Sequence, residues 1–391
     1  MKEKGKKTIN FILYIIYVAI YLYVVRKYGM GSEDSKIRYY ALVFIIVFGF
    51  ISFLLISLKK DGIKLKEKKF LLSLFVSFLF LVFSYSKVRS VGATFDSRTI
   101  IQIFLFLLPT IYAFVAINLF SKEEIVKMFK FTTIALILTY FMEENHSISQ
   151  IFNLSNWLNI DIIHSSSFTE SHLCARCFTI LFLFFNYTYW TDKENNNKKY
   201  LILTFIFTVL CFKRMDILVA IFTFLFGKYF SFKAKTGSKK IIIATIVVAL
   251  LTIFYLDFLS GNVLKNVNVY ELTSGRDRIL RLWSTLKFFS YGYGTSMLVI
   301  GRSLELDLIQ MYLEMNIFAL LSFVFTYLYF TKNNIYSFFI MLYVLLNMLL
   351  ASSLANTLSW IILMITIAFI SSNSNDKENS DGKNTKIVKK I

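Results

Sequence analysis

Three arginines in the longest segment between apolar runs are well suited to chemistry on an anion. Arg276, Arg278 and Arg281 lie within residues 260–307, and Asp277 stands between the first two. A guanidinium binds phosphate or carboxylate through a planar fork of N–H donors. The segment therefore predicts either a basic helix docked on lipid headgroups or a binding surface for a lipid-linked phosphate. Both interpretations stay open.

The same segment predicts a helix that lies along the membrane surface. Ser274 followed three residues later by Asp277 is typical of a helix start. From there apolar and basic side chains recur at helical spacing and fall on two faces. The predicted faces are Ile279, Leu282, Trp283 and Leu286 on the apolar side, and Arg278, Arg281 and Thr285 on the polar side.

Two further arginines lie in apolar sequence. Arg176 falls within the predicted span 173–190, and Arg214 lies between the short apolar runs 200–212 and 216–230. An arginine inside a span is costly unless it is paired or lines a wet cavity. Snorkelling to the headgroups would account for Arg176, and a tight turn would account for Arg214. Both positions also suit a pyrophosphate site.

Proton transfer needs a carboxylate or an imidazole near these arginines. Glu170 lies shortly before the predicted span that contains Arg176. Asp307 lies at the start of the span that follows residues 260–307, which we call the large loop. The candidate catalytic residues are Glu170, Asp307 and Arg276. The candidate pyrophosphate-binding residues are Arg176, Arg214, Arg276, Arg278 and Arg281. A loop histidine is solvated by default, so the three histidines are weaker candidates: His146, His164 and His172.

Motifs for nucleotides, cofactors and metals are absent from the sequence. It has no P-loop, no dinucleotide fingerprint, no H-E-x-x-H and no D-x-D. Cys174 and Cys177 form a C-x-x-C without a second ligand pair, which is a weak metal signal. We therefore predict no metal and no cofactor. Energy-coupled transport and transfer from a nucleotide sugar lack support.

Composition places the chain in a membrane. Hydrophobic residues make up 57% of its 391 residues, and apolar runs of about 17–22 residues are long enough to cross a bilayer as helices. Open sheets cannot satisfy their backbone in lipid, so the predicted class is an all-α polytopic membrane protein. The predicted spans, about twelve, are 9–25, 40–58, 70–86, 99–120, 126–142, 173–190, 200–212, 216–230, 241–259, 308–330, 335–351 and 354–371.

The net charge of +19 does not indicate a nucleic-acid partner. Its lysines gather in short loops, as the positive-inside rule requires. With a retained first span and a cytoplasmic N-terminus, every basic residue of the predicted inner segments is lysine. Every arginine lies on the predicted outer side, which indicates an anionic ligand there: Arg26, Arg38, Arg89, Arg98, Arg176, Arg214, Arg276, Arg278, Arg281 and Arg302.

The chain predicts one integral membrane domain, residues 1–371, in the cytoplasmic membrane of a bacterium, with both termini in the cytoplasm. Two predicted outer segments are long, 143–172 and 260–307. Residues 372–391 are rich in Asn, Ser, Asp and Lys, which predicts a disordered cytoplasmic tail.

The large loop carries a series of motifs: Thr273-Ser274-Gly275-Arg276, Trp283, Gly292-Tyr293-Gly294, and Asp307 before Leu308. This series resembles the Wzy-type polysaccharide polymerases and the related O-antigen ligases, as does Phe212-Lys213-Arg214 in a short outer turn. The resemblance covers the topology of the whole chain, but its motifs only around 210–216 and 273–315. Many members carry a His-Asn pair where this chain has Leu306-Asp307, so the resemblance places no histidine base here.

The resemblance implies a metal-independent, inverting glycosyltransferase with a lipid-linked donor. A polyprenyl pyrophosphate, undecaprenyl in type, carries the growing glycan, and a second lipid-linked repeat unit supplies the acceptor hydroxyl. The product is a capsular or O-antigen-type surface polysaccharide. Arginines would stabilise the pyrophosphate leaving group, and Glu170 or Asp307 would accept the proton. The implied partners are the lipid-linked oligosaccharide, the bilayer, a flippase and a chain-length regulator protein.

Two other functions stay open. An O-antigen-ligase-like transferase of finished glycan shares the donor chemistry of a polymerase, so sequence separates the two poorly. A lipid-linked oligosaccharide flippase, which is a transporter, would also have about twelve spans. The two long outer segments and the absence of an internal repeat disfavour the flippase.

Overall fold

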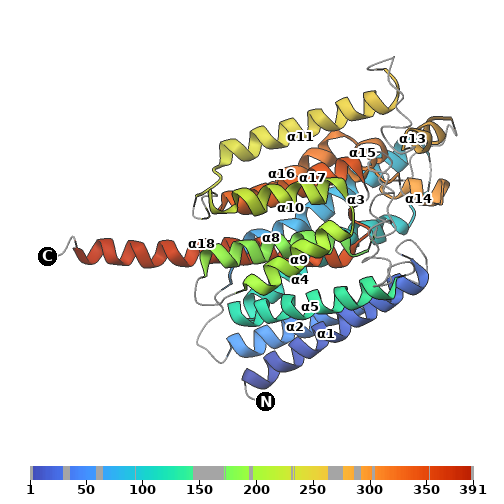
Figure 1. Ribbon diagram of the computed structural model, residues 1–391. Coiled ribbons are helices and arrows are strands. Elements are labelled where there is room, and N and C mark those ends of the chain that lie inside the picture. Colours follow the sequence, from blue (N-terminus) through green and yellow to red (C-terminus); the bar gives the residue numbers. More distant parts are fainter. Residues whose placement is uncertain are drawn as a thin grey trace, which may run out of the picture.

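The computed structural model describes residues 3–29, 36–58, 65–92, 94–143, 171, 173–192, 197–229, 232, 234–262, 276–285, 292–301, 304–351 and 353–388. Within these ranges every regular element is a helix, and the long helices form one bundle with similar axes (Figure 1). The helices are α1 Glu3–Tyr28, α2 Ile37–Ser57, η2 Lys68–Leu71, α3 Leu72–Ser90, α4 Arg98–Leu119, α5 Lys122–Met142, α8 Ala175–Thr191, α9 Lys198–Leu210, α10 Arg214–Phe226, η3 Gly227–Tyr229, α11 Ser238–Leu259, α13 Arg276–Thr285, α14 Thr295–Val299, α15 Asp307–Glu314, α16 Ile317–Tyr329, α17 Ile335–Leu350 and α18 Thr357–Val388.

The predicted all-α membrane class is confirmed. Among the described residues, seven helical segments are long and apolar enough to cross a membrane: Glu3–Tyr28, Ile37–Ser57, Lys68–Ser90, Arg98–Leu119, Lys122–Met142, Ser238–Leu259 and Thr357–Ser374. The other predicted spans also coincide with helices, but these are shorter. The total of about twelve crossings therefore stays a prediction.

The predicted span 308–330 is two helices. α15 ends at Glu314, and α16 begins at Ile317. Asn316 lies between them with extended backbone, and its side-chain oxygen accepts a hydrogen bond from the N–H of Ala319 at 2.9 Å. Asparagine is a favoured N-cap residue because it satisfies such a free donor. The cap starts a new helix and lets α15 take its own direction.

The pair α9 and α10 forms a hairpin of two 13-residue helices. At about 1.5 Å per residue each is about 20 Å long, which is short of a hydrocarbon core of about 30 Å. The connection passes through Phe212, which has a φ of 52°. A left-handed backbone at a bulky residue is strained, and such strain gathers at functional sites.

Helix α18 lies at the centre of the bundle. Its first turns are buried all round, and it packs against α4 and α8. A helix that is apolar on every side is typical of such a position. α18 remains helical to Val388 and extends out of the bundle in Figure 1. It thus covers most of residues 372–391, whose disorder stays a prediction.

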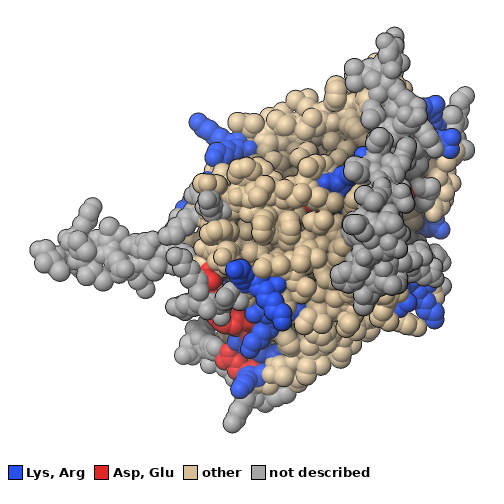
Figure 2. All heavy atoms as spheres, in the orientation of Figure 1, with Lys and Arg blue, Asp and Glu red and all other residues tan. Residues whose placement is uncertain are grey.

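The outer surface of the bundle is largely apolar. Helices α2, α3, α10 and α11 expose many large hydrophobic side chains, including Phe44, Phe75, Phe78, Phe222 and Leu250. Figure 2 shows a broad face without charge between two ends that carry basic side chains. Such a belt suits a lipid bilayer, because apolar surface is favoured out of water.

The two ends of the bundle differ in their basic residues. Lys66, Lys69 and Lys332 mark one end, where Lys69 Nζ donates to Ser371 Oγ at 2.8 Å and the Lys332 carbonyl accepts from Thr236. All the described arginines lie at the opposite end, which we call the arginine end, in α13 or near the ends of α1, α2, α3, α4, α8 and α10. Helix α1 begins and α18 leaves the bundle at the lysine end, with the two chain ends well apart (Figure 1). The side of the membrane that each end faces stays a prediction.

Candidate functional site

Arg176 is the best-defined predicted site residue. It is the second residue of α8 and is partly buried at the arginine end. Its Nη2 donates a hydrogen bond to Asn347 Oδ1 at 3.1 Å, and its Nη1 donates to Ser353 Oγ. Its Nε is buried with no hydrogen-bond partner in the described part of the chain. The guanidinium is thus fixed by two neutral groups instead of reaching toward headgroups.

Asp307 lies next to this arginine. It is the first residue of α15 and is buried, and its Oδ2 accepts hydrogen bonds from the N–H groups of Ser353 at 2.5 Å and Leu354 at 2.9 Å. Ser353 therefore contacts Arg176 through its hydroxyl and Asp307 through its backbone. The structure brings together two residues that are far apart in the sequence, Arg176 and Asp307.

The contacts of Asp307 are those of an anchor. Two N–H donors on one carboxylate oxygen hold the α17–α18 connection, of which residues 351 and 353–356 are described, against α15. Asn356 fixes the other end of the connection, since its Nδ2 donates to the Leu173 carbonyl at 2.8 Å and its Oδ1 accepts from Tyr21 at 3.0 Å. Residues 353–356 are therefore held to α1, α8 and α15.

Asp216 connects helices α10 and α17 to this site. Asp216 is buried in the first turn of α10, and its Oδ1 accepts a hydrogen bond from the Tyr343 hydroxyl of α17. One turn further along α17, Asn347 Nδ2 donates to the Tyr343 carbonyl at 3.4 Å, and Asn347 also accepts from Arg176. We call this set the polar network: Asp216, Tyr343, Asn347, Arg176, Ser353 and Asp307.

Removing the Tyr343 hydroxyl is expected to destabilise the bundle. Tyr343→Phe leaves Asp216 Oδ1 without this donor, while Asp216 Oδ2 is already buried with no partner among the described residues. A buried group that loses its partner costs about 1–3 kcal/mol. The free energy of unfolding of the detergent-solubilised protein should fall for Tyr343→Phe and for Asp216→Asn. The double variant should lose less than the sum. Strict additivity would contradict the contact.

Two residues with left-handed backbone each lie two positions before a candidate site residue. Phe212 (φ 52°) comes two residues before Arg214, and Glu305 (φ 58°) comes two residues before Asp307. Left-handed backbone outside glycine persists only where the surrounding structure imposes it, and it gathers at sites. Arg214 itself is exposed at the start of α10, on the helix that carries Asp216.

The Gly292-Tyr293-Gly294 turn packs beside the polar network. Burial, followed by the nearby carboxylates of Asp307 and Glu314, raises the pKa of Tyr293. The buried Glu314 holds the turn by accepting hydrogen bonds from the N–H groups of Gly294 at 2.6 Å and Ser296 at 2.7 Å. On the other side, the Tyr293 N–H donates to Ser84 Oγ of α3 at 3.0 Å. The turn is therefore fixed between α3 and α15.

Gly292→Ala is expected to displace this turn. Gly292 has a φ of +92°, and an added Cβ would lie 2.8 Å from the Cβ of Ser84. Gly301→Ala is a matched control, because Gly301 has a φ of +77° but open space around its Cβ. Overpacking should cost the first variant about 1–3 kcal/mol more than the second. The free energies of unfolding of the two variants in detergent test this. Equal losses would show that backbone strain alone matters.

The predicted helix in residues 260–307 is present as α13, and its place along the membrane surface stays a prediction. Asp277 and Leu280 are buried, and α13 packs on α11, where Arg276 lies within electrostatic reach of Tyr255. Leu282 is 42% exposed. Arg281 Nη2 pairs with Asp277 Oδ2 at 2.6 Å, although the Arg281 side chain is 70% exposed.

The three α13 arginines share the arginine end with Arg176 but stand on a different helix. Arg278 and Arg281 are exposed there, and Arg276 is partly buried. Glu170, the three histidines, Arg302, Ser274 and Leu286 lie outside the described residues. The described residues contain no group of three metal-ligating side chains.

Sequence reasoning did not include Asn347, Ser353, Tyr343 or Asp216 among the site residues. Asn347 carried a signal, since it is an amide inside an otherwise apolar predicted span. Asp216 carried a weaker signal, because it follows Arg214 closely at the start of a short apolar run and a charged residue there also suits a turn. Tyr343 and Ser353 carried no signal, because tyrosine and serine are common in apolar helices and at their ends.

The comparisons with known proteins give no match. No family model, curated protein or solved structure matches this chain.

Proposed function

We propose that this protein polymerises polyprenyl-pyrophosphate-linked oligosaccharide repeat units on the outer face of a bacterial cytoplasmic membrane. The observation that supports the proposal most is the set of contacts that the partly buried Arg176 side chain makes. Its hydrogen-bond partners are the neutral Asn347 and Ser353, and it forms no ion pair within the described chain. A partly buried guanidinium without a direct ion pair is costly. The carboxylate of Asp307 reaches it only through Ser353, and an incoming anion offsets the remaining cost.

Pyrophosphate is an anion that suits this end of the bundle. When the acceptor hydroxyl attacks the anomeric carbon of the donor, the bond to the pyrophosphate oxygen breaks and negative charge develops on the leaving group. Fixed guanidinium groups stabilise that charge. We assign this role to Arg176, with Arg214, Arg276, Arg278 and Arg281 around it. Attack from the face opposite the leaving group inverts the anomeric centre.

The attacking hydroxyl must lose a proton. Glu170 and Asp307 are the two carboxylates proposed as acceptors. Asp307 already binds two backbone N–H groups, so its observed contacts favour an anchoring role. Glu170, which precedes α8 by a few residues, is therefore the preferred acceptor.

Arg214→Ala and Arg276→Ala are each expected to abolish long polymer while leaving the protein in the membrane. Arg214 is exposed, and losing its charge removes part of the proposed leaving-group stabilisation. Polymer length on a gel and protein abundance in membranes check this result. Normal long polymer from either variant would contradict the assignment of that arginine.

Deletion of the protein tests the function as a whole. Surface polysaccharide is run on a gel, and lipid-linked intermediates are extracted from the same cells. Loss of the polysaccharide ladder, with single repeat units on the outer leaflet, is the expected result. A normal ladder still attached to its lipid would indicate a ligase, and repeat units trapped on the inner leaflet would indicate a flippase. Unchanged glycans would contradict all three functions.

A further inference from the structure

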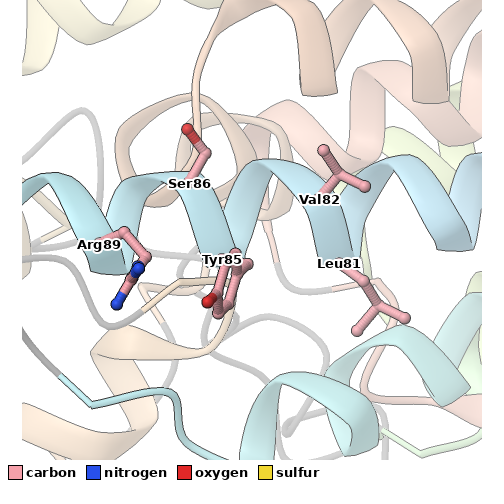
Figure 3. Close-up of a pocket in the computed structure, with 5 residues that line it drawn as sticks. All are labelled: Leu81, Val82, Tyr85, Ser86 and Arg89. Carbon is pink, nitrogen blue, oxygen red and sulfur yellow. The ribbon is translucent and has the colours of Figure 1, made fainter.

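A surface hollow lies on the half of α3 that approaches the arginine end. Its volume is about 550 Å³, and it is lined by Leu81, Val82, Tyr85, Ser86 and Arg89. Figure 3 shows two rows of side chains along the helix, Leu81, Tyr85 and Arg89 at one edge and Val82 and Ser86 at the other. Rows four residues apart form ridges with a groove between them. We call this groove the α3 hollow.

The α3 hollow changes from apolar to cationic along its length. Val82 and Tyr85 are 43% and 52% exposed on a helix that is long and apolar enough to cross a membrane. Arg89 follows in the last turn of α3, where its guanidinium lies 5.8 Å from the Tyr85 ring. Within the described chain this guanidinium has no hydrogen bond or ion pair. An apolar groove that ends at such a cation matches an amphiphile with an anionic head.

The dimensions of the hollow favour a single apolar chain. Leu81 and Arg89 are eight residues apart, which is about 12 Å along a helix. The lining residues all come from adjacent rows of one helix, so the hollow offers one groove along which an apolar chain can lie. A phospholipid would bring two chains side by side.

The same helix connects the hollow to the candidate site. Ser84, on the inner side of α3, accepts the hydrogen bond from the Tyr293 N–H that fixes the Gly292-Tyr293-Gly294 turn. Tyr293 in turn lies close to Asp307 of the polar network. One helix thickness therefore separates the hollow from the turn beside the site.

We propose that the α3 hollow docks the lipid part of a polyprenyl phosphate or pyrophosphate, with Leu81, Val82 and Tyr85 along the chain and Arg89 on the phosphate. This inference rests on the proposed function, because it takes the lipid to be that of the glycan donor or acceptor. In this arrangement the bilayer delivers the substrate laterally to α3, and its glycan extends over the arginine end.

Native mass spectrometry of the full-length protein in detergent tests the docking site. The probes are undecaprenyl phosphate and phosphatidylglycerol, added separately and in competition. Val82→Trp fills the hollow, and Arg89→Gln removes its charge. The matched controls are Val47→Trp on α2, where Val47 is 51% exposed, and Arg26→Gln near the end of α1.

Undecaprenyl phosphate should bind the wild type and both controls, and its binding should weaken about tenfold or more in the two hollow variants. Unchanged binding by both hollow variants would overturn the proposal, as would phosphatidylglycerol binding with the same dependence on Arg89. Melting temperatures equal to wild type exclude misfolding. If a variant fails to fold, photo-crosslinking of the lipid probe to wild-type α3 replaces it, and crosslinks that avoid residues 81–89 would overturn the proposal.

The readout separates this proposal from the proposed function. If the protein binds lipid in the hollow but makes no polymer, the proposed polymerase function is refuted and the proposed docking site is supported. If the wild type makes polymer and the hollow variants bind lipid as well as the wild type does, the docking site is refuted and the polymerase function is supported.

Discussion

Arg176→Ala is expected to reduce polymer formation by at least about 100-fold. The guanidinium is held by Asn347 and Ser353 at the arginine end, and it forms no ion pair within the described chain. Removing one fixed donor to a developing negative charge typically costs 100- to 1,000-fold in rate. The measurement is polymer yield per unit of membrane protein in a deletion strain that expresses the variant.

Two further variants serve as controls for this result. Arg26→Ala removes an exposed arginine at the same end of the bundle and should leave the yield unchanged. Arg176→Lys keeps the charge but cannot present a planar fork to two partners, so it should fall between wild type and alanine. Full polymer from a stable Arg176→Ala protein would refute the role of this residue.

Asp307→Ala is expected to lose activity by roughly 100-fold, because a misplacement of about 1 Å at a site has such an effect. The substitution frees the Ser353 and Leu354 N–H groups and releases the connection that positions Arg176. Asp307→Asn should behave differently. Both donors go to one oxygen, and an amide oxygen accepts them as well.

We therefore expect Asp307→Asn to retain most of the polymer yield of the wild type. Yield and melting temperature, measured for both variants, check the pair. If Asp307→Asn were as inactive as Asp307→Ala while remaining folded, Asp307 would be the proton acceptor and the preference for Glu170 would be wrong.

The sequence predicted the membrane class for physical reasons, and it singled out two residues that the structure brings together, Arg176 and Asp307. Apolar run length determines which segments can cross a bilayer, and the described helices coincide with the predicted spans. The described arginines also share one end of the bundle, where Lys27, Lys87 and Lys213 accompany them. Arg176 and Asp307 were candidates because a charged side chain in a membrane span is costly unless it is paired or lines a polar site.

The partners of those residues could not be predicted from periodicity. Arg176 meets Ser353 only because α8 and the α17–α18 connection are neighbours in space, at a separation of 177 residues. The break between α15 and α16 depends on one capping residue, Asn316, inside a continuous apolar pattern. Hydropathy is averaged over many residues and does not register a single asparagine, so the sequence predicted one helix over 308–330.

The most direct test uses purified protein in liposomes. The substrate is the lipid-linked single repeat unit extracted from cells that lack the protein, supplied without nucleotide and with a chelator present. A ladder of lipid-linked oligomers, with one polyprenyl pyrophosphate released per bond formed, and no ladder from Arg176→Ala, is the predicted result. Repeat units that remain single with folded wild-type protein would contradict the proposed polymerase.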